Sequence, residues 1–181
     1  MKISYLILIV FLFPLTMNGQ TEKLTKKEKK ALKAKESEEK LMVLYKAVES
    51  QQFVVETDQV FGDDGSVFNV SPMMNFFTID STQSTIQLSF TGLIGWNNVG
   101  GVTVDGVVDK FDLHEFKAGK PITLIGSINQ RSGGNTQFTM YVYSSGMANV
   151  TISGNWGSSI TFQGRLFTLA ESKVYKGVPL N

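Results

Sequence analysis

The densest group of titratable side chains occupies one short segment of the chain. Its members are Asp105, Asp109, Asp112, His114 and Glu115. Carboxylates beside an imidazole have the chemistry to bind a metal ion or to exchange protons with a substrate. Strand alternation over residues 107–116 divides the group, because it places Asp112 and His114 on one face and Asp109 and Glu115 on the other. The pattern therefore predicts a solvated strand face, with no catalytic residue and no metal ligand.

The remaining composition excludes several further kinds of chemistry. The chain has no cysteine and one histidine, so disulfides, zinc fingers, iron–sulfur clusters, thiol catalysis and a lipid-anchored N-terminal cysteine are ruled out. No serine lies in a Gly-x-Ser-x-Gly turn, and the glycine-rich stretch 92–101 lacks the lysine of a phosphate loop. A net charge of +1 argues against a nucleic-acid-binding protein. We expect a protein that is not an enzyme and needs no cofactor.

Large, adaptable apolar side chains are a stronger functional signal than the charged ones. They gather in the segments 73–77, 94–96 and 138–143. On the inside of a barrel, such side chains can line a cavity for an apolar or amphipathic small molecule. The candidate ligand-binding residues are Phe76, Trp96, Met140 and Val142. The alternative interpretation is that these side chains only fill the core.

The N-terminus has the pattern of an export signal. Lys2 precedes a run of nine apolar residues from Tyr5 to Phe13, and the small residue Gly19 offers a cleavage point. The run is too short to span a bilayer, and no later stretch is long and apolar enough to do so. The sequence therefore predicts a cleavable signal peptide over residues 1–19 and a periplasmic or secreted protein that is not a lipoprotein.

Residues 20–50 are predicted to form a helix rich in lysine and glutamate. Residues 21–50 hold nine lysines and six glutamates, a net charge of +3. Thr25 and Glu28 form a capping-box pattern, which predicts the start of the helix. Apolar residues return at helical spacing only near its end, at Leu41, Leu44, Tyr45 and Val48. We expect residues 25–40 to be solvated and residues 41–50 to pack on the following domain.

Residues 51–169 are predicted to form an antiparallel β domain, and residues 170–181 a C-terminal tail. The candidate strands are 53–61, 66–71, 74–80, 84–91, 99–104, 107–116, 121–130, 135–144, 147–154 and 158–168. Turn dipeptides such as Asp64-Gly65 and Asp105-Gly106 predict tight hairpins between strands. A meander of this length must close to protect its edges. We predict a mainly β fold, an antiparallel meander closed as a lipocalin-like barrel, with one N-terminal helix; a two-sheet β-sandwich is the alternative.

The order of these features resembles one known family. A signal peptide is followed by Leu24-Thr-Lys-Lys-Glu-Lys-Lys-Ala-Leu32 and Phe53-Val-Val-Glu-Thr-Asp58. The later segments are Tyr141-Val-Tyr-Ser-Ser-Gly-Met-Ala-Asn-Val-Thr151 and Ser158-Ser-Ile-Thr-Phe-Gln-Gly164. This pattern resembles exported proteins of Bacteroidetes-type bacteria, grouped as domain of unknown function number forty-two fifty-one. The resemblance implies a periplasmic or secreted β domain and carries over no functional residue.

Two functions follow from these observations as expectations. The first is a non-enzymatic periplasmic binding module for an apolar or amphipathic small molecule. The alternative is a structural or interaction protein of the cell envelope, which docks through the basic helix and exposed aromatic side chains. Its partner would be an envelope protein, an acidic partner or phospholipid headgroups.

Overall fold

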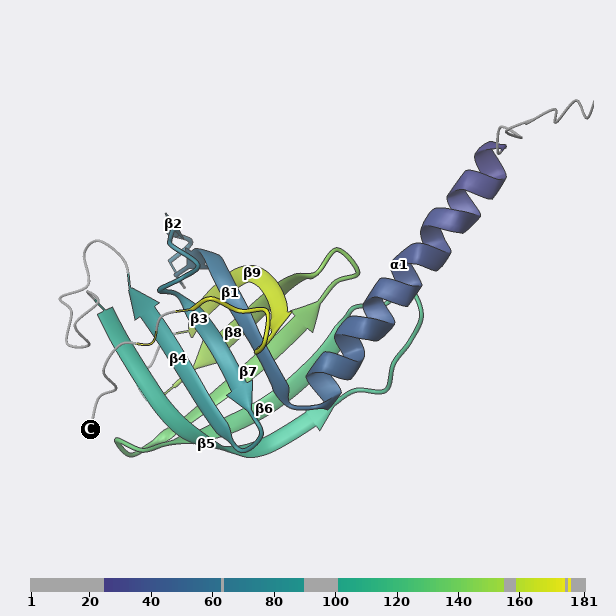
Figure 1. The fold of residues 1–181 in the computed structure, drawn as a ribbon. Helices are drawn as coiled ribbons and strands as arrows, with labels where there is room; N and C mark the ends of the chain where they lie inside the picture. Colours follow the sequence, from purple (N-terminus) through teal and green to yellow (C-terminus); the bar gives the residue numbers. More distant parts are fainter. Residues whose placement is uncertain (1–24, 63, 90–100, 155–158, 175, 177–181) are drawn as a thin grey trace, which may run out of the picture.

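The computed structural model describes residues 25–62, 64–89, 101–154, 159–174 and 176, and it has one helix and nine strands in these ranges. The elements are α1 (Lys26–Glu49), β1 (Gln52–Phe61), β2 (Val67–Asn69), β3 (Phe76–Asp80), β4 (Gln83–Ser89), β5 (Gly101–Leu113), β6 (Ile122–Gln130), β7 (Asn135–Val142), β8 (Met147–Ser153) and β9 (Ser159–Thr168). β1 and β3–β9 pair in an antiparallel ring, which β1 and β9 close. The short strand β2 pairs with β1 beside β3. The predicted barrel with an N-terminal helix is confirmed, in place of the sandwich (Figure 1).

The strand β5 corrects the prediction of a hairpin at Asp105-Gly106. One continuous strand, Gly101–Leu113, stands in place of the predicted strands 99–104 and 107–116. Gly106 pairs with Ser84 of β4 on one side and Gln130 of β6 on the other. A Cβ at Gly106 would overlap the side chain of Ile128 and lie 2.7 Å from the carbonyl oxygen of Asn129. The glycine is therefore needed for close strand packing, not for a turn.

A β-bulge in β5 changes which side chains face the interior. The pairing of β5 with β6 shifts between Val108 and Lys110, so Asp109 is an extra residue. Strict alternation places Val108 and Phe111 on opposite faces, whereas both pack against the core. That part of the predicted face assignment was wrong, because alternation alone contains no bulge.

Aromatic side chains meet in the middle of the barrel. Phe77 of β3 and Phe138 of β7 come from opposite sides of the ring, and their ring centroids are 5.0 Å apart. Phe53 of β1 packs edge-on against Phe77 at 6.2 Å. The ring of Phe138 lies over Gly126 of β6, where a Cβ would overlap that ring and the carbonyl oxygen of Lys110. The aromatic contact therefore closes the lumen at this level.

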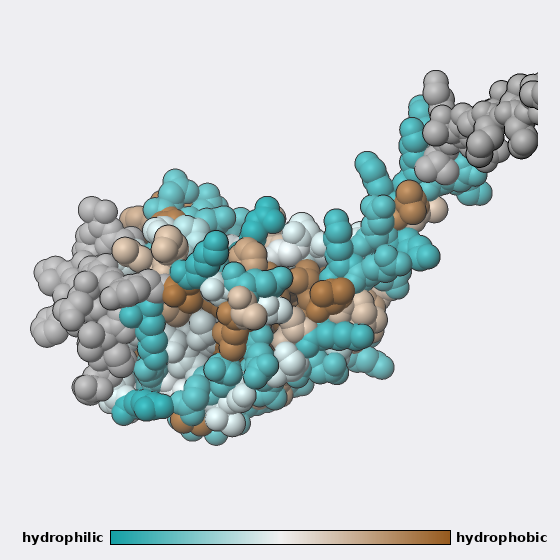
Figure 2. Space-filling view, viewed as in Figure 1, coloured by the Kyte–Doolittle hydropathy of each residue, from teal (hydrophilic) through white to brown (hydrophobic). Residues whose placement is uncertain are grey.

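The helix α1 has a docked part and a projecting part. Leu41 and Val48 are buried in the same cluster as the barrel core, and Tyr45 packs edge-on against Phe116 with centroids 5.5 Å apart. Residues 26–36 are exposed, and this half extends away from the barrel (Figure 1). Hydrophilic residues cover most of the projecting part (Figure 2). The docked half therefore covers one end of the barrel.

Two residues beyond β9, Ser172 and Lys176, bond to the outer face of the barrel. After β9 the chain crosses over β1 and β3 (Figure 1). The hydroxyl of Ser172 donates to the Glu56 carboxylate at 2.8 Å, and the Lys176 Nζ lies 2.8 Å from the Asp105 carboxylate. The Asp105 carboxylate also accepts a hydrogen bond from the Thr85 hydroxyl at 2.7 Å.

Because aromatic side chains close the lumen beside Gly126, we expect a side chain at this position to destabilise the folded protein. The substitution Gly126→Ala places a methyl group against the Phe138 ring and the backbone of β5. Overpacking of this kind costs about 1–3 kcal/mol, so we expect a clear fall in the free energy of unfolding measured with urea. Gln137→Ala, on the exposed side of β7, is the control and should cost much less. Equal effects of the two substitutions would show that the centre of the barrel is loosely packed.

The capping box predicts a pH-dependent helix start. The Glu28 carboxylate accepts a hydrogen bond from the Thr25 backbone N–H at 2.7 Å, and the Thr25 hydroxyl accepts one from the Glu28 N–H at 3.3 Å. These bonds to Thr25 lower the pKa of Glu28 from 4.5. The cap is complete above the ordinary pKa and is lost as the pH falls through the lowered value.

We therefore expect the Cα chemical shifts of Lys26 to Lys30 to move toward coil values on acidification. Glu28→Gln keeps a hydrogen-bonding side chain but does not titrate, so its helix start should be insensitive to pH in this range. The same acid transition in both proteins would disprove the assignment of the cap to the Glu28 carboxylate.

Candidate functional site

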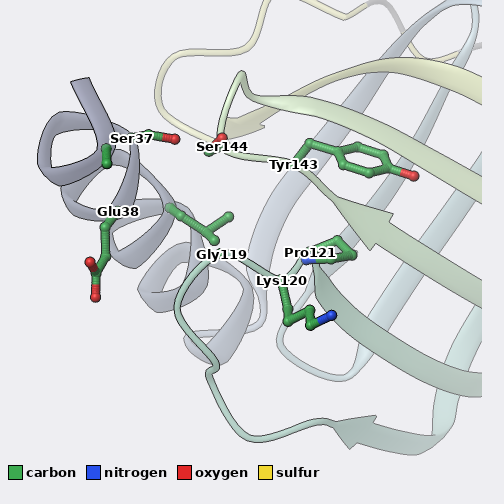
Figure 3. A pocket seen from close by; sticks show the side chains of 9 residues that line it. Ser37, Glu38, Gly119, Lys120, Pro121, Tyr143 and Ser144 are labelled. Carbon is green, nitrogen blue, oxygen red and sulfur yellow. The ribbon is translucent and has the colours of Figure 1, made fainter. Parts of the chain in front are cut away.

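A groove lies where α1 leaves the barrel. It has a volume of about 490 Å³, and its lining residues are Ala34, Ser37, Glu38, Leu41, Gly119, Lys120, Pro121, Tyr143 and Ser144. Four of these come from α1, three from the β5–β6 connection and two from the β7–β8 turn. Figure 3 shows Ser37 on the helix and Ser144 on the turn at facing sides of the groove.

The two walls of the groove are held by independent contacts. Leu41, buried to 3% exposure, anchors the helix wall to the barrel core. In the β7–β8 turn, the Tyr143 N–H donates to the Met147 carbonyl at 2.9 Å, and Gly146 adopts a positive φ of 83° that glycine tolerates. In the β5–β6 connection, Lys120 donates its N–H to the Lys117 carbonyl at 3.1 Å. The groove is therefore formed by ordered backbone on both sides.

The groove combines apolar and polar side chains in a small space. Leu41, Ala34 and Pro121 offer apolar surface, while Ser37 and Ser144 offer hydroxyl groups. Lys120 and Glu38 add one positive and one negative charge at the edge. This composition suits a ligand with an apolar part and a hydrogen-bonding or charged part.

The structure separates the four candidate ligand-binding residues predicted from the sequence. Met140 and Val142 are fully buried in the barrel core. Phe76 is also buried but does not belong to that core, because it precedes the inward-facing Phe77 and points to the outer face. Trp96 lies outside the described residues. Phe76 therefore shares no cavity with Met140 and Val142.

The outer face around Phe76 contains a buried polar network. Phe76 pairs with Glu56 of β1 and Gln87 of β4. The Gln87 side chain donates to the Met74 carbonyl at 3.0 Å and accepts from the Thr103 hydroxyl at 3.0 Å. Phe76 therefore lies beside buried, hydrogen-bonded side chains on the outer face of the sheet, where its role is structural.

Four of the five members of the charged cluster lie on an open, solvated surface, and the fifth, Asp105, is half-buried and bonded to Thr85 and Lys176. Asp109, Asp112, His114 and Glu115 are all exposed, and Asp109 accepts a hydrogen bond from the Ser127 hydroxyl at 3.1 Å. A shallow polar depression of about 420 Å³ includes Asp112 and His114. Among the residues that the structure describes, no group of three His, Cys, Asp or Glu side chains could hold a metal ion.

Exposed apolar side chains also gather away from the groove, at β2 and the turn that follows it. Val67, Phe68, Met73 and Met74 are all exposed there. Met73 and Met74 therefore lie on the surface, outside the barrel interior that holds Met140. Within the described ranges, no helix is long and apolar enough to cross a membrane.

The sequence reasoning missed the groove residues. Pro121 comes directly before β6, and Tyr143 comes directly after β7. Neither residue differs in the sequence from residues that flank other strands. Ser37 lies in the middle of a charged helix. Only the apolar spacing of Leu41 with the residues after it signalled that the helix would dock, and nothing in the pattern identified the strand ends that it meets.

The comparisons with known proteins agree on one family. The family model "Domain of unknown function (DUF4251)" matches residues 35–166. The crystal structure of a DUF4251 family protein from Bacteroides eggerthii is similar to this chain, with 30% sequence identity and a TM-score of 0.62. That match covers 77% of this chain and 94% of the Bacteroides chain. No curated protein matches. The resemblance noted in the sequence is thus confirmed, and the chain belongs to the DUF4251 family.

Proposed function

We propose that this protein is an exported, non-enzymatic binding module that holds an amphipathic small molecule in the groove between α1 and the barrel. The observation that carries the proposal is the mixed lining of the groove, where Leu41 and Pro121 lie beside Ser37, Ser144 and Lys120. An apolar part of a ligand would contact the leucine and proline. Its polar or anionic end would reach the hydroxyls and the lysine ammonium group.

The packing of the barrel favours the groove over the interior as the ligand site. The contact between Phe77 and Phe138 bridges the lumen, and Met140 and Val142 are fully buried against other core side chains. A ligand inside would have to separate these side chains and forfeit their packing energy. The groove can take a ligand with no change in the core.

The pattern of an export signal in the sequence supports a role outside the cytoplasm. The apolar run Tyr5–Phe13 and the small residue Gly19 fit a cleavable signal peptide, which would deliver the protein to the periplasm or beyond. The absence of cysteine is compatible with that environment, because the buried core stabilises the fold without disulfides.

A titration with 1-anilinonaphthalene-8-sulfonate tests the proposal. This probe has an apolar ring system and an anionic sulfonate, and its fluorescence rises in an apolar site. Ala34 lines the groove, so Ala34→Phe should fill part of it and weaken the binding of the probe about tenfold, or about 1.4 kcal/mol.

The control is Ala31→Phe, which adds the same side chain to an exposed position of α1 that does not line the groove. This variant should bind the probe like the unchanged protein. If the unchanged protein does not bind the probe, or if both variants bind it equally well, the groove is not the ligand site.

A further inference from the structure

One face of the projecting half of α1 carries a stripe of lysines. Lys26, Lys29, Lys30 and Lys33 follow the spacing i, i+3, i+4, i+7, which places them on one side of a helix. All four are exposed and line one depression on the helix surface together with Leu32 and Glu36. We call these four residues the lysine stripe. Counting Glu36, the lining of this depression has a net charge of 4 − 1 = +3.

The lysine stripe opposes the formation of the helix that carries it. Like charges three and four residues apart repel each other, and positive charges near a helix N-terminus interact unfavourably with the helix dipole. Among the described residues, none of the four lysines forms an ion pair; the pair on this helix joins Lys35 to Glu39 at 3.9 Å. The stripe is therefore a strong positive charge whose lysines have no ion-pair partner among the described residues.

The lysine stripe lies on the same side of α1 as the face that docks on the barrel. Lys26 and Leu44 are 18 residues apart, which is five turns of an α-helix, and Lys30 and Leu41 are 11 residues apart, about three turns. Since α1 is straight, the stripe continues the docking face beyond the edge of the barrel (Figure 1). The stripe and the barrel end thus border a concave corner, and the groove lies at its base.

We propose that the lysine stripe is the docking surface for an acidic, extended segment of a partner protein. The carboxylates of such a segment complement four ammonium groups in a row, and the row spans about 10 Å along the helix. A flat lipid surface parallel to the stripe would meet the barrel before it met all four lysines. A single polypeptide chain is narrow enough to enter the corner and lie along the helix.

This surface is distinct from the groove that holds the proposed small molecule. None of the four lysines lines the groove, and none of the groove residues belongs to the lysine stripe. The two proposals therefore fail independently.

Fluorescence anisotropy with a fluorescein-labelled oligo-glutamate peptide tests the proposal on the mature chain at low salt. The stripe variant is Lys26→Gln, Lys30→Gln and Lys33→Gln. The matched control is Lys35→Gln, Lys46→Gln and Lys110→Gln, which removes the same charge from the far side of α1 and from the barrel surface. Each exposed ion pair contributes little on its own, so the loss of three should weaken binding about tenfold in the stripe variant.

The control variant should retain most of the affinity, and added salt should weaken the binding of the unchanged protein. Circular dichroism should show at least as much helix in the stripe variant, because the substitutions relieve repulsion. This result would exclude unfolding as the cause of lost binding.

Three results would overturn the proposal. The first is equal loss of affinity in the two variants, which would mean that only net charge matters. The second is no binding of the peptide by the unchanged protein. The third is binding to vesicles of phosphatidylglycerol with no binding to the peptide, which would assign the stripe to lipid headgroups.

Discussion

The contact between Phe77 and Phe138 is the constraint on which the rest of the structure depends. The two rings come from opposite strands of the barrel, and their centroids are 5.0 Å apart. Phe138 can take this position only because Gly126 has no side chain. Eight strands enclose a space that side chains can fill or that one small ligand can occupy. Here aromatic side chains bridge that space, and the docked half of α1 covers one end of the barrel with Leu41 and Val48. The interior therefore contributes stability, and the proposed ligand site lies on the outside.

The helix α1 connects this packing to the proposed function. Its second half packs on the barrel through Leu41, Val48 and the edge-on contact of Tyr45 with Phe116. That contact fixes the direction in which the first half projects. It thereby forms the groove and presents the lysine stripe beyond it. The apolar packing of α1 on the barrel thus positions two surfaces of different chemistry, an amphipathic groove and a basic helix face, at the same corner of the molecule.

Local patterns in the sequence predicted where the helix, the turns and the strands lie. They were less successful in predicting which side chains face the interior of the barrel. The capping box at Thr25 and the turn at Gly65 depend on neighbouring residues, and the structure confirms them. The bulge at Asp109 and the continuous strand through Gly106 depend on the neighbouring strands, which the local pattern does not contain. The same limit explains Phe76, which is apolar and buried but faces outward. The groove was unpredictable because it needs the position of α1 against two distant turns.

Intermolecular nuclear Overhauser effects between 1-anilinonaphthalene-8-sulfonate and protein methyl groups test the central claim most directly. The claim is that ligands bind in the α1 groove and not in the lumen. It predicts contacts from the probe to the methyl groups of Ala34 and Leu41, which line the groove, and none to Met140 or Val142, which lie in the core. Strong contacts to Met140 and Val142, without contacts to Ala34, would contradict the account and show that the barrel opens to hold its ligand inside.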